Sequence, residues 1–153
     1  MIFNFNVSML KLKFGKEGKM AHTIIIVDDD SFFRSLARDI LEHNGFEVFL
    51  ASNVDNFAHT ISSLSSPPDL ILFDVNLGAE ISGDQLLASF KHSIVKKYPA
   101  LKTKFVIISS KTDTELQEIA DKCGADGYIR KSSLNIDYGG FIFASQIKSF
   151  LEK

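Results

Sequence analysis

Three aspartates follow directly on an apolar run near the start of the chain. Residues 24–27 are Ile-Ile-Ile-Val, and Asp28, Asp29 and Asp30 come next. Neighbouring carboxylates repel one another, and burial beside a core also removes part of their hydration. Two interpretations of this stretch are open: a solvated turn that begins a helix, or a site that holds a cation.

Three later apolar runs also end in a polar residue that could take part in chemistry: Asp74, Ser109 and Lys131. A hard divalent cation such as Mg²⁺ relieves repulsion between carboxylates, and a lysine or a hydroxyl beside it binds an anion. Carboxylates, Mg²⁺, lysine and hydroxyl together are the parts of a phosphoryl-transfer site in which one aspartate is the nucleophile.

The elements that carry these residues must bring them together. Apolar runs alternate with longer amphipathic stretches, and the runs lie at 24–27, 48–50, 70–73, 105–108 and 127–129. Near-continuous apolar character is typical of parallel strands covered on both faces. Five strand–helix units predict an open parallel α/β sheet with helices on both faces. Because ligands of such sheets bind at the carboxyl ends of the strands, the polar residues are expected at one edge.

The amphipathic stretches predict the helices and their buried faces. The first helix is expected to begin at Asp30 or Ser31 and to bury both Phe32 and Phe33. The third is expected to begin at residue 83 or 84 and to carry Val95 on its apolar face. The fourth is expected to begin at residue 113 or 114 and to end at Gly124, and the last to follow residues 139–140.

Composition limits the class of protein. A chain of 153 residues can form one domain with its own core, and a net charge of −2 gives no strong field toward nucleic acid or membrane. The single cysteine, Cys123, excludes an intramolecular disulfide. No apolar run approaches the roughly 20 residues of a membrane span, so we expect a cytoplasmic protein.

From about Thr23 to Lys153 the chain resembles the receiver domains of two-component response regulators. The motifs that carry the resemblance are VDD at 27–29, PDLILFD at 68–74, SG at 82–83, IISS at 107–110, GADGY at 124–128 and IRK at 129–131. The resemblance implies a flavodoxin-like, doubly wound (βα)5 sheet with the strand order 2-1-3-4-5. It also divides the chain into an N-terminal extension, residues 1–21, and a receiver domain, residues 22–153.

The resemblance also implies the roles of the acidic residues. Asp74 matches the phosphoacceptor, which takes a phosphoryl group from a histidine kinase or a phosphotransfer protein. Asp28 and Asp29 match the acidic pair that binds Mg²⁺ together with Asp74. Asn76 matches the position whose backbone carbonyl completes the metal site. Asp30 is expected to begin the first helix.

Three further residues match the part of the family pattern that responds to the phosphoryl group. Lys131 matches the lysine that pairs with a phosphoryl oxygen. Ser109 matches the hydroxyl residue that moves to contact the same group. Tyr128 matches the aromatic residue whose ring turns inward when the hydroxyl residue shifts. Phosphorylation is thereby expected to change a protein-interaction face.

The function implied is that of a single-domain response regulator, a signalling protein rather than an enzyme, although it can catalyse its own phosphorylation and slow dephosphorylation. Its expected partners are the phosphodonor and a downstream protein target, with no nucleic acid and no membrane, and it is expected to be a monomer or a phosphorylation-dependent dimer. A phosphorelay intermediate and a receiver fragment of a hybrid histidine kinase remain alternatives. A phosphatase with an aspartate nucleophile is disfavoured, because such enzymes usually need an acid where this chain has Asn76.

The chain departs from the family pattern in two places and extends beyond it in a third. Gly78 stands where a proline is usual, and Ser132 follows Lys131 where the family has a proline with a cis peptide bond. A cis bond without proline costs roughly 2.5–4 kcal/mol, so we predict a trans bond. Residues 1–20 carry four lysines against one glutamate, a net charge of +3 (4 − 1). This basic extension is predicted to be flexible or loosely docked, with an added strand or a mis-assigned start as alternatives.

Overall fold

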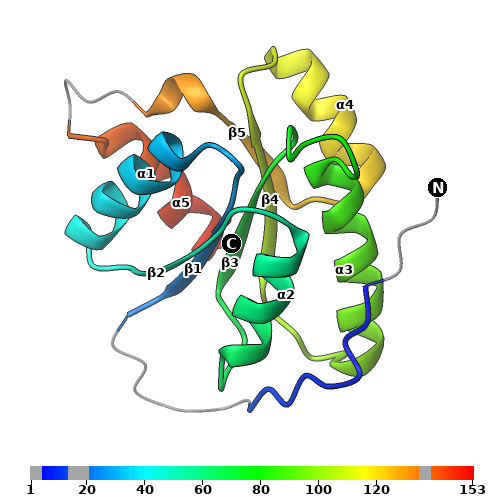
Figure 1. The fold of residues 1–153 in the computed structure, drawn as a ribbon. Coiled ribbons are helices and arrows are strands. Elements are labelled where there is room, and N and C mark those ends of the chain that lie inside the picture. The colour runs from blue at the N-terminus through cyan, green and yellow to red at the C-terminus, as the bar shows by residue number, and fades with distance from the viewer. Residues whose placement is uncertain (1–4, 14–20, 135–138) are drawn as a thin grey trace.

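The structure, a computed structural model, describes residues 5–13, 21–134 and 139–153. A parallel sheet of five strands lies at its centre (Figure 1). The strands are β1 (Thr23–Val27), β2 (Glu47–Ala51), β3 (Leu70–Asp74), β4 (Lys104–Ser109) and β5 (Gly127–Arg130). Their order is β2-β1-β3-β4-β5, which confirms the predicted flavodoxin-like topology. The order reverses between β1 and β3, where a ligand site is expected in such sheets.

Helices cover both faces of the sheet, as predicted. One face carries α1 (Ser31–His43) and α5 (Phe141–Leu151), and the other carries α2 (Val54–Ser63), α3 (Gly83–Lys97) and α4 (Asp113–Cys123) (Figure 1). A short 3₁₀ helix, η1 (Lys131–Ser133), follows β5. Within the described ranges, no helix is long and apolar enough to cross a membrane.

Side chains from the helix boundaries satisfy the first backbone N–H groups of the helices. Asp30 accepts hydrogen bonds from the backbone N–H groups of Phe32 and Phe33, so it caps α1 as predicted. Ser82 and Thr112 form capping boxes that begin α3 and α4. Gly124, in the left-handed conformation, ends α4. The predicted helix ends therefore follow from local chemistry.

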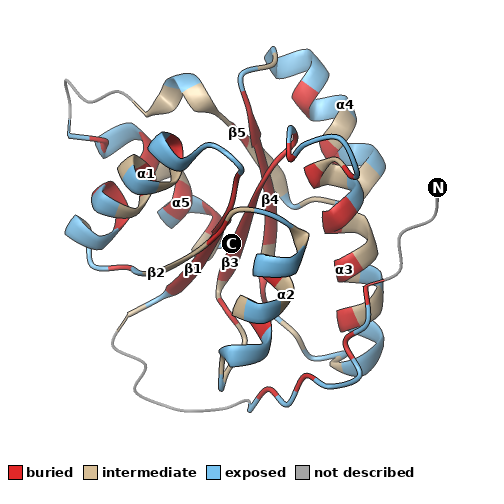
Figure 2. Cartoon of the chain, viewed as in Figure 1, coloured by how far each residue is buried: buried red, intermediate tan, exposed pale blue. Residues whose placement is uncertain are grey.

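Alternate residues of the central strands enter two separate cores. Ile24 and Ile26 of β1 pack with α1 and α5, whereas Ile25 and Val27 pack with α2, α3 and α4. Every residue of β1 and β3 is buried (Figure 2). This burial on both faces explains why the apolar runs show no alternation with polar residues.

Two residues predicted on buried helix faces are exposed. Phe32 is 75% exposed and Val95 is 39% exposed, so these predictions were wrong. Each lies next to a buried residue of its helix, Phe33 and Ile94 respectively. Consecutive helical residues point about 100° apart, so one of two adjacent apolar residues falls outside a narrow buried stripe.

Residues 5–13, part of the predicted extension, lie against α2 and α3. The side chains of Phe5, Val7, Leu10 and Leu12 are buried there and belong to the core on that side of the sheet. The ring of Phe5 meets the rings of Phe57 and Phe90 at centroid distances of 5.6 and 5.0 Å. This part of the extension is therefore docked. The rest of it, residues 1–4 and 14–20, lies outside the described residues.

Polar contacts hold the same segment at the end of α3. The Lys97 ammonium donates to the carbonyl oxygens of Val7, Ser8 and Leu10 at 3.0, 2.8 and 2.6 Å. The Tyr98 hydroxyl donates to the Leu10 carbonyl at 2.7 Å and accepts from the backbone N–H of Leu12 at 3.1 Å. Lys97, the last residue of α3, and Tyr98, its C-cap, thus form hydrogen bonds with backbone groups that have no partner in the sheet.

Candidate functional site

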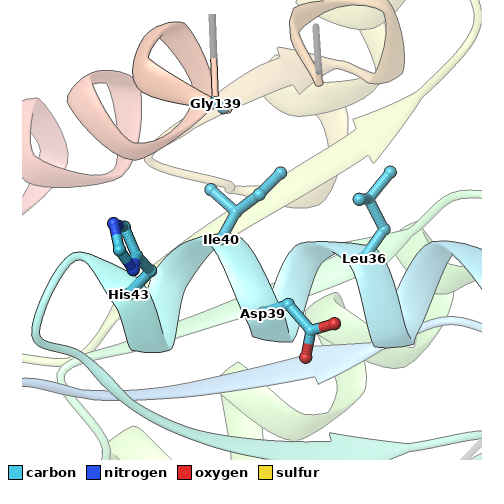
Figure 3. Close-up of a pocket in the computed structure, with 6 residues that line it drawn as sticks. Leu36, Asp39, Ile40, His43 and Gly139 are labelled. Atoms are coloured by element: carbon cyan, nitrogen blue, oxygen red, sulfur yellow. The ribbon is translucent and has the colours of Figure 1, made fainter. Parts of the chain in front are cut away.

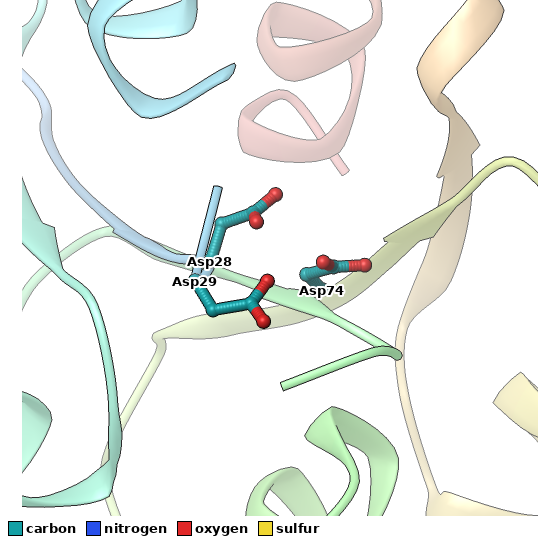
Figure 4. A group of neighbouring side chains, drawn as sticks. All are labelled: Asp28, Asp29 and Asp74. Carbon is teal, nitrogen blue, oxygen red and sulfur yellow. The ribbon is translucent and has the colours of Figure 1, made fainter. Parts of the chain in front are cut away.

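Three of the predicted acidic residues lie together at the carboxyl edge of the sheet (Figure 4). β1 and β3 are neighbours with Val27 opposite Phe73, so Asp28, directly after β1, and Asp74, the last residue of β3, come side by side. Carboxylate oxygens of Asp28, Asp29 and Asp74 lie within 4.8 Å of one another. Asp28 and Asp74 are buried, whereas Asp29 is exposed. The cluster predicted from strand ends is therefore present in the fold.

Lys131 reaches the same point from the end of β5, the outermost strand on the far side of β3 from β1. Its ammonium lies 2.9 Å from Asp28 Oδ2 and 3.2 Å from Asp74 Oδ2. Lys131 begins η1 directly after β5, and β4 separates β5 from β3, so the long side chain crosses the end of β4. A single cation thus bridges two buried carboxylates that come from different strands.

Hydrogen bonds from the main chain hold the other oxygen of each buried carboxylate. The backbone N–H of Asp30 donates to Asp28 Oδ1 at 2.8 Å, and the backbone N–H of Asn76 donates to Asp74 Oδ1 at 3.2 Å. Each carboxylate is therefore fixed on one side by the backbone and on the other by Lys131. These contacts preorganise the polar edge of the sheet.

The buried carboxylates at this edge outnumber the positive charges beside them. Burial, and after it the charge of Asp28, raises the pKa of Asp74 from 3.8 to about 7, although Lys131 and the Asn76 N–H act in the opposite direction. Burial lowers the pKa of Lys131, but its contacts with Asp28 and Asp74 outweigh burial and raise it overall. One lysine therefore does not compensate two buried carboxylates. A group of carboxylate oxygens with this deficit suits a hard divalent cation such as Mg²⁺.

Ser109 and Tyr128 lie near the cluster but outside it. Ser109 is buried at the end of β4, the strand next to β3, and its hydroxyl accepts a hydrogen bond from the backbone N–H of Lys111 at 3.2 Å. Tyr128 lies on β5 and is half-buried. Partial burial and the neighbouring Asp113 raise the pKa of its hydroxyl. The Ser109 hydroxyl is thus bound to the loop that follows β4, and the Tyr128 ring lies toward α4.

The peptide bond after Lys131 is trans, as predicted for a lysine followed by serine. The described residues contain no cis peptide bond. Lys131 therefore reaches the acidic residues from a 3₁₀ turn with ordinary backbone geometry.

Three contacts at this edge were not predicted from the sequence. The ring of Phe33 lies 4.5 Å, centroid to Nζ, from the Lys131 ammonium. The Arg34 guanidinium donates to the backbone carbonyl of Asp28 at 2.6 Å. A Cβ on Gly83 would lie 1.8 Å from the carbonyl oxygen of Asp74, so only glycine fits there. The SG motif at 82–83 is a sequence signal for the close approach of Gly83, whereas nothing in the sequence indicates the contacts of Phe33 and Arg34.

A pocket of about 310 Å³ lies elsewhere, between α1 and the start of α5 (Figure 3). Its lining consists of Leu36, Asp39, Ile40, His43, Gly139 and Gly140. In Figure 3 the side chains of Leu36 and Ile40 lie on the side of α1 that faces Gly139, whereas that of Asp39 points away. None of the clustered aspartates lines the pocket, so it is separate from the acidic site.

Known proteins resemble this chain over most of its length. The response regulator receiver domain matches residues 24–137. Chemotaxis protein CheY of Halobacterium salinarum is 32% identical over 113 residues, which cover 73% of this chain and 86% of that protein. CheY of Bacillus subtilis is 38% identical over 73 residues, 47% of this chain and 58% of that protein, so the aligned part spans less than two thirds of it. The crystal structure of a CheY-like receiver domain protein from Methanospirillum hungatei superposes with a TM-score of 0.66 at 27% identity and covers 86% of this chain and 94% of that one.

Proposed function

Because the chain belongs to the family of response regulator receiver domains, we propose that it is a phosphorylation-controlled signalling protein whose Asp74 accepts the phosphoryl group. One observation carries this proposal: oxygens of Asp28, Asp29 and Asp74 cluster within 4.8 Å at the sheet edge, with the Lys131 ammonium on two of them. A purely structural ion pair would not need two buried carboxylates on one lysine with a third, exposed carboxylate beside them.

The proposed reaction is a phosphoryl transfer from a histidine kinase or a phosphotransfer protein. An Asp74 carboxylate oxygen forms a bond to phosphorus while the bond from phosphorus to the donor's imidazole nitrogen breaks, and the imidazole takes up a proton. Lys131 Nζ, 3.2 Å from Asp74 Oδ2, lies where it can pair with an oxygen of the arriving group. Ser109 supplies a hydroxyl on the adjacent strand for a hydrogen bond to the same group.

The residues present fit a divalent metal ion. The carboxylates of Asp28, Asp29 and Asp74 and the backbone carbonyl of Asn76 would hold it, and oxygen ligands of this kind suit Mg²⁺. Bound there, the ion would neutralise charge on the transferred group and on the carboxylates. Since a protonated carboxyl is not a nucleophile, the raised pKa of Asp74 makes an added cation important for its ionisation near neutral pH.

The output of the proposed switch is a change in a protein-interaction face. Ser109 moves from its loop contact toward the phosphoryl group, and Tyr128 on β5 changes the position of its ring in response. The downstream partner is a protein, and the phosphoryl group can alternatively pass from Asp74 to another histidine.

Intact-protein mass spectrometry after incubation with acetyl phosphate and Mg²⁺ tests the proposal. We expect the wild type to gain the mass of one phosphoryl group and Asp74→Asn to gain none. Asp30→Asn is the matched control, because asparagine also caps a helix and Asp30 lies outside the cluster. It should be phosphorylated within about twofold of the wild-type rate. Phosphorylation of Asp74→Asn, or none of the wild type, would refute the proposal.

A further inference from the structure

We propose that Phe33 is a positioning residue for phosphoryl acceptance, and that its aromatic face holds the Lys131 ammonium at the site. This inference rests on the proposed function and adds a residue to which that function assigns no role. The ring centroid lies 4.5 Å from Lys131 Nζ, within the range of a cation–π interaction. Such contacts gain strength as the cation loses water, and the Lys131 side chain is 21% exposed.

The helix cap fixes the ring relative to the acidic residues. Asp30, next to the metal-site pair Asp28 and Asp29, accepts a hydrogen bond from the backbone N–H of Phe33 at 3.2 Å. Phe33 is 7% exposed and packs in the core between the sheet, α1 and α5. The chain segment that carries the carboxylates therefore also places an aromatic face against the lysine.

Lys131 depends on side-chain contacts to stay in place. It follows β5, an edge strand paired only with β4, and begins a turn of three residues. Among the described residues, its ammonium has three neighbours: the two carboxylates of Asp28 and Asp74, and the Phe33 ring. Two of the three neighbours belong to the proposed metal site.

The ring differs from the carboxylates in how it responds to a metal ion. A divalent cation competes with Lys131 for the oxygens of Asp28 and Asp74, whereas an aromatic face is no ligand for a hard cation. The attraction between the ring and the ammonium therefore persists when the carboxylates turn toward metal. Phe33 keeps Lys131 ready for the phosphoryl oxygens under the conditions in which transfer occurs.

The contact itself can be measured without metal or phosphodonor. In protein with ¹³C-labelled lysine in EDTA buffer, the ε-CH₂ protons of Lys131 should resonate upfield of those of the other lysines, because they lie over a ring. The signal is assigned by its loss in Lys131→Met. In Phe33→Met, which fills similar volume with no aromatic face, the upfield shift should disappear. A Lys131 signal without upfield shift in the wild type overturns the inference.

The role in phosphoryl acceptance is tested with a series of fluorinated phenylalanines at position 33. One, two or three fluorines weaken the negative face of the ring stepwise with little change in size. The quantity to measure is the maximal rate constant for phosphorylation divided by the concentration of acetyl phosphate that gives half of that rate. We expect this ratio to fall progressively, by about tenfold over the series. The loss should appear mainly in the half-saturating concentration, because Lys131 pairs with the donor's phosphoryl oxygens.

Phe46 provides the matched control. It is also 7% exposed and belongs to the same core as Phe33, but in the described part of the chain the ring that meets the Lys131 ammonium is that of Phe33. The same series at position 46 should leave the rate unchanged, while Phe33→Met and Phe46→Met should lower the melting temperature by similar amounts. If the protein accepts the phosphoryl group but its rate does not change across the series at position 33, the inference is overturned and the proposed function stands. A wild type that accepts none overturns the proposed function and, with it, this inference.

Discussion

At the carboxyl edge of the sheet two buried carboxylates share one lysine, whereas at the α2–α3 face four apolar side chains of residues 5–13 enter the core. Both regions bring together segments that are far apart in sequence. The carboxyl edge concentrates like charge, which raises the free energy of the folded state until a cation arrives. The α2–α3 face removes apolar surface from water, which lowers that free energy.

Lysines at the two places illustrate the difference. Lys97 donates to three backbone carbonyls at 2.6–3.0 Å, which are neutral acceptors that need a donor. Lys131 lies between Asp28 and Asp74, which attract more positive charge than it supplies. The first lysine completes a structure, and the second belongs to a site that remains ready to bind. Four predictions test this contrast.

The largest expected effect is on stability, from the apolar segment. Phe5→Ala removes a buried ring that contacts Phe57 and Phe90, and should lower the free energy of unfolding by about 3 kcal/mol. Met9→Ala is the control, because Met9 lies in the same segment and is 81% exposed. Urea denaturation measures both. If Phe5→Ala lowers the phosphorylation rate by more than the loss of folded protein explains, the docked segment and the carboxyl edge are not separate in function.

Lys131→Met tests the charge deficit at the edge. Without the lysine, phosphorylation by acetyl phosphate should slow by roughly 100-fold, because the transferred group loses a preorganised positive charge. Affinity for Mg²⁺, measured by titration calorimetry, should increase, because a competing cation has been removed from Asp28 and Asp74. Weaker Mg²⁺ binding would show that Lys131 supports the carboxylates rather than competing with the metal.

The pH dependence of stability should report on Asp74. Its pKa is 3.8 when exposed and about 7 in the folded protein, so between these values the folded state binds more protons than the unfolded state. In EDTA, the contribution of this group is fully favourable below pH 3.8 and is lost as the pH rises through about 7.

Asp74→Asn should remove this dependence and raise the free energy of unfolding at pH 8 by about 1–3 kcal/mol. The comparison is made by urea denaturation from pH 5 to pH 8. An Asp74→Asn protein that loses stability with pH as the wild type does would assign the effect to other groups. Excess Mg²⁺ should reduce the difference, since it stabilises only the wild-type site.

The smallest expected effect comes from the polar contacts of the docked segment. Lys97→Met should lower the free energy of unfolding by about 1 kcal/mol, because three carbonyls lose a donor but retain access to water. Lys96→Met, at an exposed neighbouring position, should have no measurable effect. Equal effects for the two variants would mean that apolar burial alone holds the segment.

The sheet and the acidic cluster could be predicted because each rests on local patterns. Apolar runs define strands, and polar residues directly after Val27 and Phe73 must meet where β1 and β3 are adjacent. The buried positions of Phe32 and Val95 were predicted wrongly, because periodicity does not choose between adjacent apolar residues at the edge of a helical stripe. The sequence left open whether residues 5–13 are flexible or docked, because their few apolar side chains are buried against side chains of α2 and α3 that lie far away in the sequence.

Short-range patterns and strand ends specify the succession of strands and helices, the family and the aspartates that meet at the carboxyl edge, so these could be predicted from the sequence alone. Three contacts became evident from the tertiary structure: the Lys131 ammonium bridges Asp28 and Asp74, the ring of Phe33 faces it, and Lys97 holds the N-terminal segment. Those contacts join residues up to 103 positions apart (131 − 28). Their geometry depends on where the folded chain places each side chain, and no local sequence pattern specifies this.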